Sequence, residues 1–216
     1  MTEEALQAIE ALHEHQMPLV GPTGHLAVTW ARIHKGDKRG RVLADAHYTR
    51  QSIGHPMWTR PGYNFCLYAD YADYGEGCAV WVWWRPKWED GRPGTKRKDG
   101  LRVLECTLFR RTGLTPLAST LIATAVAALH TPAARSDLHL DAAGRVDGLI
   151  TGIGAAKTRR GRSSKSKPGA CFRHAGWTEM DKAGGRADVW LESPWSNPHE
   201  AGEAHTILDP QRESTP

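Results

Sequence analysis

The sequence predicts a single α/β domain, and three observations support that prediction. The 216 residues are 40% hydrophobic and 24% charged, which is ordinary for a globular domain able to bury its own core. Two β-rich segments joined by a polar, glycine-bearing connection are typical of an antiparallel hairpin. Two later segments each run in the order strand, turn and helix. We expect one domain over residues 1–193 and a weakly ordered tail over 194–216, which has little to bury.

The first half of the chain is predicted to supply one helix and three strands. Apolar residues recur at helical spacing over 3–13, which predicts a short surface helix. A strand is expected over 26–33, closed by a basic turn over 35–40, with the chain returning to the core from Val42 onward. Residues 63–68 and 78–84 are predicted to be adjacent antiparallel strands. A long exposed loop follows over 85–100.

The second half is predicted to contain the two strand-helix units. The first is a strand over 101–109 followed by a helix from Leu117 to Leu129, which stops at Pro132. The second is a strand over 146–153, a basic loop over 157–167, and a helix that starts at Pro168 and ends at Gly176. A closing strand is expected over 187–191.

Cysteine usage and hydropathy exclude several classes of protein. The four cysteines show no C-x-x-C spacing, so we expect them to be reduced and structural. No run approaches the roughly 18 apolar residues of a spanning helix. The first residues are acidic where a signal peptide would be basic, so we expect a cytoplasmic protein without a membrane segment. We predict no metal site, because Cys171 and His174 form only a lone Cys-x-x-His pair.

The turn between residues 109 and 117 has the composition of a phosphate site. It reads RRTGLT from Arg110 to Thr115, which places a glycine, hydroxyls and free backbone N–H groups at a helix N-terminus. A pyrophosphate there would meet the partial positive charge of the helix and Arg110 or Arg111. An ordinary helix start, with Thr115 as N-cap and Pro116 in the first helical position, fits the same residues.

This turn resembles the cofactor loop of the GNAT acyltransferases. Their [Arg/Gln]-x-x-Gly-x-[Gly/Ala] loop is similar to Arg110-x-x-Gly113-x-Thr115, which departs at the last position. The segment from Cys171 to Trp177 resembles the aromatic-x-x-x-Gly-aromatic signature of the helix after the fifth GNAT strand. The resemblance covers about residues 40–192. It implies a GNAT-like α/β fold, in which a central mixed, mostly antiparallel sheet is flanked by helices.

The resemblance also implies an acyl-CoA-dependent transferase whose cofactor is acetyl-CoA or another acyl-CoA. The backbone of the loop would hold the CoA pyrophosphate, and the strand before it would pair with the pantetheine arm. The cofactor-binding residues implied in this way are Cys106, Thr107, Leu108, Phe109, Arg110, Arg111, Thr112, Gly113, Leu114, Thr115 and Phe172.

Three segments are more specifically similar to the phage Mom-like branch of this superfamily. They are the residues HYTRQ from His47, the helix start from Leu117 to Ser119, and the segment from Pro168 to Trp177. Proteins of that branch are associated with modifying bases in phage DNA. The resemblance therefore implies a DNA base, or the amine of a hypermodified base, as acceptor. It places Ser119 among the catalytic residues and implies the host cell cytoplasm for a phage-encoded protein.

Transfer of an acyl group to an amine requires a proton acceptor near the thioester. The candidates are Glu105 and His47, with Tyr48 as the acid that protonates the leaving thiolate. A structural histidine and an ion-pair partner on a strand are the alternative roles of His47 and Glu105. Cys106 is a conceivable acyl-accepting nucleophile, but a buried, inert thiol is the commoner role.

Two basic segments predict contact with nucleic acid, and DNA is the expected partner. In the first, cations interleave with or follow tryptophans between Trp81 and Lys98, which places aromatic platforms beside phosphate-binding side chains. For Trp81 and Trp83 alone, a core-facing position is the favoured interpretation. The second segment, 157–167, contains no acidic residue. The predicted nucleic-acid contacts are Arg50, Arg85, Lys87, Lys96, Arg97, Lys98, Arg159, Arg160 and Arg162.

Two other functions stay open at the level of the sequence. The first is a non-catalytic nucleic-acid-binding protein that retains a GNAT fold, which the basic loops and the lack of an unambiguous base both favour. The second is a small-molecule amine acetyltransferase whose surface charge is incidental.

Overall fold

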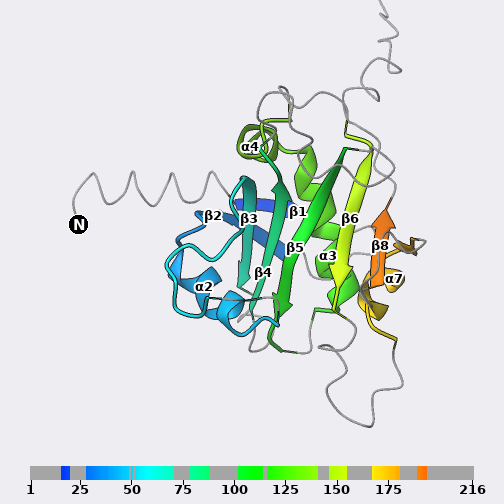
Figure 1. Cartoon of the computed structure of the whole chain (residues 1–216), viewed down its shortest axis with the longest axis horizontal. Helices are drawn as coiled ribbons and strands as arrows, with labels where there is room; N and C mark the ends of the chain where they lie inside the picture. The colour runs from blue at the N-terminus through cyan, green and yellow to red at the C-terminus, as the bar shows by residue number, and fades with distance from the viewer. Residues whose placement is uncertain are drawn as a thin grey trace, which may run out of the picture.

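An eight-stranded sheet with helices on both faces forms the centre of the computed structural model (Figure 1). The α/β class and the mixed, mostly antiparallel sheet are confirmed. The structure describes residues 16–19, 28–48, 50, 52–70, 78–87, 102–113, 116–140, 146–154, 167–180 and 189–193. The predicted helix over 3–13, the loop residues 88–100, the basic residues 157–166 and the tail over 194–216 lie outside these ranges. The predicted domain boundary at residue 193 therefore stays a prediction.

The strands follow the chain across most of the sheet. Their order in space is β1-β2-β3-β4-β5-β6-β8-β7, and every neighbouring pair is antiparallel except β5 and β6. The predicted hairpin of β3 and β4 is confirmed. The bounds of the strands are Gln16–Leu19 for β1, Val28–Ile33 for β2, Tyr63–Asp70 for β3, Cys78–Arg85 for β4, Val103–Arg111 for β5, Gly148–Ile153 for β6, Thr178–Glu179 for β7 and Val189–Ser193 for β8.

Helices cover the two faces unequally. On one face, α2 (Lys38–Asp45) packs with Trp58 over residues of β2, β3, β4 and β5. On the opposite face lie α3 (Ala118–Ala127), the 3₁₀ helix η1 (Ala128–His130), α4 (Pro132–Asp137) and α7 (Ala170–His174). Figure 1 shows α2 in front of the sheet and α3 behind it. The sheet is therefore buried on both sides near its middle.

Helix α2 is the main departure from the predicted elements, which had a turn over residues 35–40. The helix begins at Lys38 because Asp37 caps it, with Asp37 Oδ1 accepting a hydrogen bond of 2.8 Å from Arg39 N. A Cβ on Gly40 would lie 2.4 Å from Trp58 Cζ2, so this glycine allows the helix to contact the tryptophan. Val42 is 68% exposed, and the chain enters the core at Leu43, one residue later than predicted.

The first predicted strand-helix unit forms with shifted boundaries. Strand β5 continues to Arg111, so Arg110 and Arg111 belong to the strand and not to the turn. The predicted helix over 117–129 is α3 followed by η1, and it stops before Pro132 as expected. Pro132 also begins α4, which was not predicted; Thr131 caps this helix by accepting a hydrogen bond from Ala134 N.

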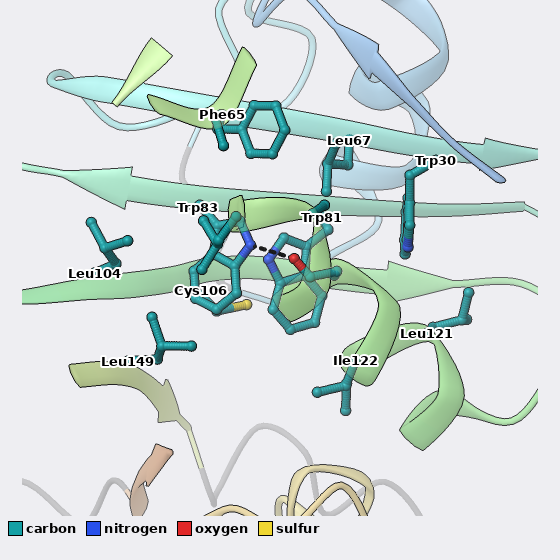
Figure 2. Packing of buried hydrophobic residues seen from close by; sticks show 14 of the residues in the cluster. Trp30, Phe65, Leu67, Trp81, Trp83, Leu104, Cys106, Leu121, Ile122 and Leu149 are labelled. Carbon is teal, nitrogen blue, oxygen red and sulfur yellow. Dashed lines mark hydrogen bonds between the residues drawn. The ribbon is translucent and has the colours of Figure 1, made fainter. Parts of the chain in front are cut away.

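The main core is a layer of tryptophans between the sheet and α3 (Figure 2). Trp30, Trp81 and Trp83 are completely buried, so the core-facing position of Trp81 and Trp83 is confirmed. The indole of Trp30 donates a hydrogen bond of 2.8 Å to Thr124 Oγ1, and that of Trp83 donates one of 3.0 Å to the carbonyl of Ala125. Because both acceptors belong to α3, these bonds fix the helix against the sheet.

Candidate active site

The parallel strands β5 and β6 separate partway along their length. They pair from Val103 with Gly148 to Cys106 with Thr151, and the pairing stops there. Beyond that point β5 continues to Arg111 with β4 as its partner, and β6 continues to Ile153 with β8 as its partner. In the described part of the sheet, the β6-facing edge of β5 after Cys106 therefore has no strand beside it.

A β-bulge marks the point of separation. Opposite β4, Val82 pairs with Leu108 and Trp83 pairs with Cys106, so Thr107 is an extra residue in β5. A bulge bends its strand and increases the local twist. The hydroxyl of Thr151 donates a hydrogen bond of 3.1 Å to the carbonyl of Cys106. This side-chain hydrogen bond joins β5 to β6 at the point where their backbone pairing ends.

A cavity of about 150 Å³, which we call the β5–β6 cleft, lies at this separation. Several predicted site residues from different parts of the chain meet there. The remaining wall comes from the end of β6 and from the region of α7. Its lining residues are His47, Tyr48, Cys106, Thr107, Leu108, Phe109, Thr151, Gly152, Ile153, Gly169, Cys171 and Phe172.

Two glycines allow close packing around this cleft. Gly169 has a φ of +79°, and a Cβ there would lie 2.5 Å from Ile153 Cδ1. A Cβ on Gly152 would meet the ring of Trp190 at 2.9 Å. On the far wall the rings of Phe109 and Phe172 pack edge to face, with centroids 6.1 Å apart. The result is a slot with apolar walls and an exposed strand edge.

His47 and Tyr48 reach the cleft from the end of α2. Their rings lie 4.3 Å apart, and Gly154 N donates a hydrogen bond of 3.4 Å to the Tyr48 hydroxyl. Burial lowers the pKa of His47 to about 4, and the positive charge of Arg110 contributes in the same direction. His47 is therefore an uncharged imidazole at neutral pH.

The thiols of the cleft are poor nucleophiles. Burial raises the pKa of Cys106 well above its ordinary value, and it also raises the pKa of Cys171. A thiol that stays protonated at neutral pH does not attack a thioester readily. The structure thus favours the inert role for Cys106.

The predicted phosphate turn follows β5 directly. Thr112 extends the ladder with β4, because its N–H donates a hydrogen bond of 2.8 Å to the carbonyl of Cys78. Gly113 has a φ of +71°, which glycine adopts without strain. Arg111 donates to the carbonyls of Gly113 and Pro116 at 3.0 and 3.1 Å, so it shapes the turn from inside. Leu114 and Thr115 lie outside the described residues.

The expected cap at the start of α3 does not form. The helix begins at Ala118, and its N-cap is Leu117, which makes no side-chain hydrogen bond to the first turn. The alternative interpretation, with Thr115 as N-cap and Pro116 in the first helical position, is therefore wrong. Among the described residues no side chain caps this N-terminus, and an uncapped N-terminus retains the partial positive charge that attracts anions.

Glu105 and Ser119 do not line the cleft. Glu105 accepts a hydrogen bond of 2.9 Å from Arg60, which confirms the ion-pair role considered for it. Burial raises the pKa of Glu105, and the charge of Arg60 opposes this effect. Ser119 lies half-buried in the first turn of α3. Their catalytic roles stay predictions.

A second cavity adjoins the cleft at the bulge, since Thr107 and Leu108 line both. We call it the Arg60 cavity; its volume is about 340 Å³. Apart from Arg50, Thr107 and Leu108, its residues escaped the sequence analysis, as did Thr151 and Gly169 of the cleft, because only the tertiary fold brings them together. The other lining residues are Arg50, Ser52, His55, Met57, Trp58, Thr59, Arg60, Pro61 and Val82.

Three of the predicted nucleic-acid contacts, Arg50, Arg85 and Lys87, have partners within the described structure, and for Lys87 this is the ring of Tyr63, with Nζ 5.7 Å from its centroid. Arg50 donates hydrogen bonds to Asp45 and to the carbonyl of His55, and its side chain is 9% exposed. Arg85 is buried, and its guanidinium lies 4.8 Å from the ring centroid of Tyr63. Lys87 is exposed. The other predicted contacts, Lys96, Arg97, Lys98, Arg159, Arg160 and Arg162, lie outside the described residues.

Comparison of the chain with protein-family models and with curated proteins finds no match. In the described ranges, no helix has the length and apolar character needed to cross a membrane. The same ranges contain no group of three or more His, Cys, Asp and Glu side chains that could hold a metal ion.

The buried, uncharged state of His47 predicts a specific loss of stability in acid. The folded pKa of about 4 lies below the ordinary value of 6.5, so protonation favours the unfolded chain. The contribution of neutral His47 to the free energy of unfolding is fully present above pH 6.5 and is lost as the pH drops toward 4. When the pH is lowered from 7.5 to 4.5, the free energy of unfolding measured in urea should fall by about 2–3 kcal/mol more for the wild type than for His47→Asn.

The matched control for this experiment is His34→Asn, which removes an exposed imidazole. This variant should follow the wild type across the same pH range. Parallel losses of stability in the wild type and in His47→Asn would contradict the buried, neutral state of His47.

Proposed function

We propose that the protein is an acyl-CoA-dependent N-acyltransferase with a GNAT-like fold, and that the β5–β6 cleft holds the acyl arm. One observation carries the proposal. The parallel strands part immediately after Cys106, and the cavity formed there is lined by His47, Tyr48, Phe172 and the strand segment from Cys106 to Phe109. The resemblance to GNAT proteins implied cofactor contacts for Phe172 and this strand segment, and the need for a proton acceptor and donor singled out His47 and Tyr48. The fold brings all of these residues into one cavity.

The cleft has the features that an extended amide-bearing arm requires. The free edge of β5 offers backbone N–H and C=O groups, as an edge strand does to an added strand. The apolar walls from Phe109 and Phe172 suit methylene groups. Following β5 to its end leads to Gly113 and to the N-terminus of α3, where phosphates would lie. Arm and phosphates would therefore follow one continuous path.

Acyl-CoA would supply the acyl group as a thioester. In the transfer, the new C–N bond forms as the C–S bond breaks, so the attacking nitrogen loses a proton and the departing sulfur gains one. His47, an uncharged imidazole, would accept the proton, and the Tyr48 hydroxyl would donate one to the sulfur. The two rings lie side by side on the same wall of the cleft.

The low pKa of His47 favours an aromatic amine as acceptor. An exocyclic amine of a nucleobase is uncharged at neutral pH, so it needs no deprotonation before attack. Its nitrogen becomes strongly acidic only as the C–N bond forms, and a weak base is then sufficient. An aliphatic amine is cationic at neutral pH and would need a stronger base than an imidazole with a pKa of about 4.

The charge of the α2 face favours an acceptor in nucleic acid over a free small molecule. Residues 34–60 contain six cationic side chains, Lys35, Lys38, Arg39, Arg41, Arg50 and Arg60, against the two carboxylates Asp37 and Asp45. This segment forms α2 and most of the Arg60 cavity, which opens beside the cleft. A positive face attracts a phosphate backbone. The proposed acceptor is therefore an amine of a DNA base.

Calorimetric titration of the full chain with acetyl-CoA tests the proposal. We expect saturable binding in the micromolar range, and transfer of one acetyl group to nucleosides of added DNA, detected by mass spectrometry. Absence of binding at high micromolar acetyl-CoA would contradict the acyltransferase and favour a non-catalytic nucleic-acid-binding protein. Acetylation of free amines but not of DNA would favour a small-molecule acetyltransferase.

Substitution of Gly113 tests the placement of the phosphates. Asp and Asn have nearly the same shape, and both tolerate a positive φ better than most residues, so each should cost similar stability. Only Asp adds a negative charge beside the pyrophosphate. We expect Gly113→Asp to weaken CoA binding about tenfold or more relative to Gly113→Asn, as measured by calorimetry. Equal affinities of the two variants would place the phosphates elsewhere.

A further inference from the structure

Ile53 is an exposed apolar side chain at the tip of the loop between α2 and β3. It is 76% exposed, the highest value among the large hydrophobic residues in the described ranges. Met57, in the same loop, is 38% exposed. Single exposed apolar residues are common on protein surfaces, but Met57 lines a cavity, and Ile53 lies in the chain between Ser52 and His55, which line the same cavity.

The loop holds Ile53 in place through polar contacts at its base. Asp45 Oδ1 accepts a hydrogen bond of 2.8 Å from Arg50, and Asp45 Oδ2 accepts one of 3.0 Å from Gly54 N. The indole of Trp58 donates a bond of 3.1 Å to the carbonyl of Asp37. The tip is thus ordered before any partner binds, which lowers the entropic cost of binding through it.

The Arg60 cavity opens next to this tip. Ser52 and His55, which flank Ile53 and Gly54, line it together with Thr59 and Thr107. Their hydroxyl and imidazole groups provide hydrogen-bond donors and acceptors for the edge of a planar ring. Its volume of about 340 Å³ is within the range of small-ligand sites. A ring bound there would lie beside Thr107, at the entrance to the β5–β6 cleft.

The charge around the tip suits a nucleic-acid backbone. The two carboxylates of residues 34–60 are both engaged, Asp37 with Arg39 and Asp45 with Arg50. Two more carboxylates reach the face from the sheet: Glu105 of β5 pairs with Arg60, and Asp70 of β3 lies close enough to Arg39 to interact with its charge. The six cations of residues 34–60 still outnumber these carboxylates. The phosphates of a duplex would meet the positive surface on either side of the apolar tip.

A base within a stacked duplex cannot enter a cavity inside a protein. Proteins that act on such a base extrude it, and apolar side chains inserted at a base step are a recurrent way to unstack it. We propose that Ile53 is a wedge that enters a base step of duplex DNA, and that the Arg60 cavity receives the extruded base. This inference rests on the proposed function, because it identifies the acceptor as a base extruded from a duplex.

Base unstacking tests the wedge without acyl-CoA. The probe is a set of duplexes that carry 2-aminopurine at different positions, since the fluorescence of this base rises when it leaves the stack. Saturating the set with the full-length protein should raise the fluorescence of some members severalfold. Ile53→Ser should abolish most of this rise. Val42→Ser is the matched control, because Val42 is 68% exposed on α2, outside the loop that carries Ile53, and it should keep the rise.

The affinity of the same duplexes, measured by fluorescence anisotropy at several salt concentrations, separates unstacking from binding. All three proteins should bind within about threefold of one another, because phosphate contacts dominate affinity. Three outcomes would overturn the proposed role of Ile53. The protein would fail to bind DNA, or it would bind without a rise in fluorescence, or Ile53→Ser would leave the rise undiminished. If the protein unstacks bases but does not bind acetyl-CoA, the role of Ile53 is supported and the acyltransferase function is contradicted.

Discussion

The rest of the site depends on the separation of β5 from β6 beyond Cys106 and Thr151. A parallel ladder that continued would close the sheet and leave no edge for a ligand. The extra residue at Thr107 turns β5 away, and the Thr151 hydroxyl satisfies the carbonyl of Cys106 where the ladder ends. Each separated strand keeps a partner on its outer side, β4 for β5 and β8 for β6. The gap therefore forms without breaking the sheet.

Packing on the two faces of the sheet fixes what surrounds this gap. On one face, hydrogen bonds from Trp30 and Trp83 hold α3, whose N-terminus lies at the end of the path that leaves β5. On the other face, the contact of Gly40 with Trp58 holds α2 and the loop that follows it. His47 and the Arg60 cavity belong to this second face, so the cleft lies between two independently packed layers.

Local patterns predicted six of the eight strands and α3, but not the short strands β1 and β7 or the parts of the fold that depend on distant contacts. Residues Lys38 to Arg41 have the composition of a basic turn, and the distant side chains of Trp58 and Ile33 explain why a glycine stands inside a helix there. The charge of Arg111 suggested a phosphate ligand, whereas its guanidinium binds the carbonyls of Gly113 and Pro116. Arg50 likewise has Asp45 as its partner. A sequence shows that a cation is present but not what neutralises it. The resemblance singled out His47, Cys106 and Phe172, while Thr151 and Gly169 carry no local signal.

A crystal structure of the full chain with acetyl-CoA would test the central claim most directly. We expect the thioester in the β5–β6 cleft, between Cys106–Leu108 and Thr151–Ile153, with the arm along the edge of β5 and the pyrophosphate at Gly113 and the first turn of α3. Acetyl-CoA bound at any other surface, or strands β5 and β6 closed against each other along their length, would contradict it.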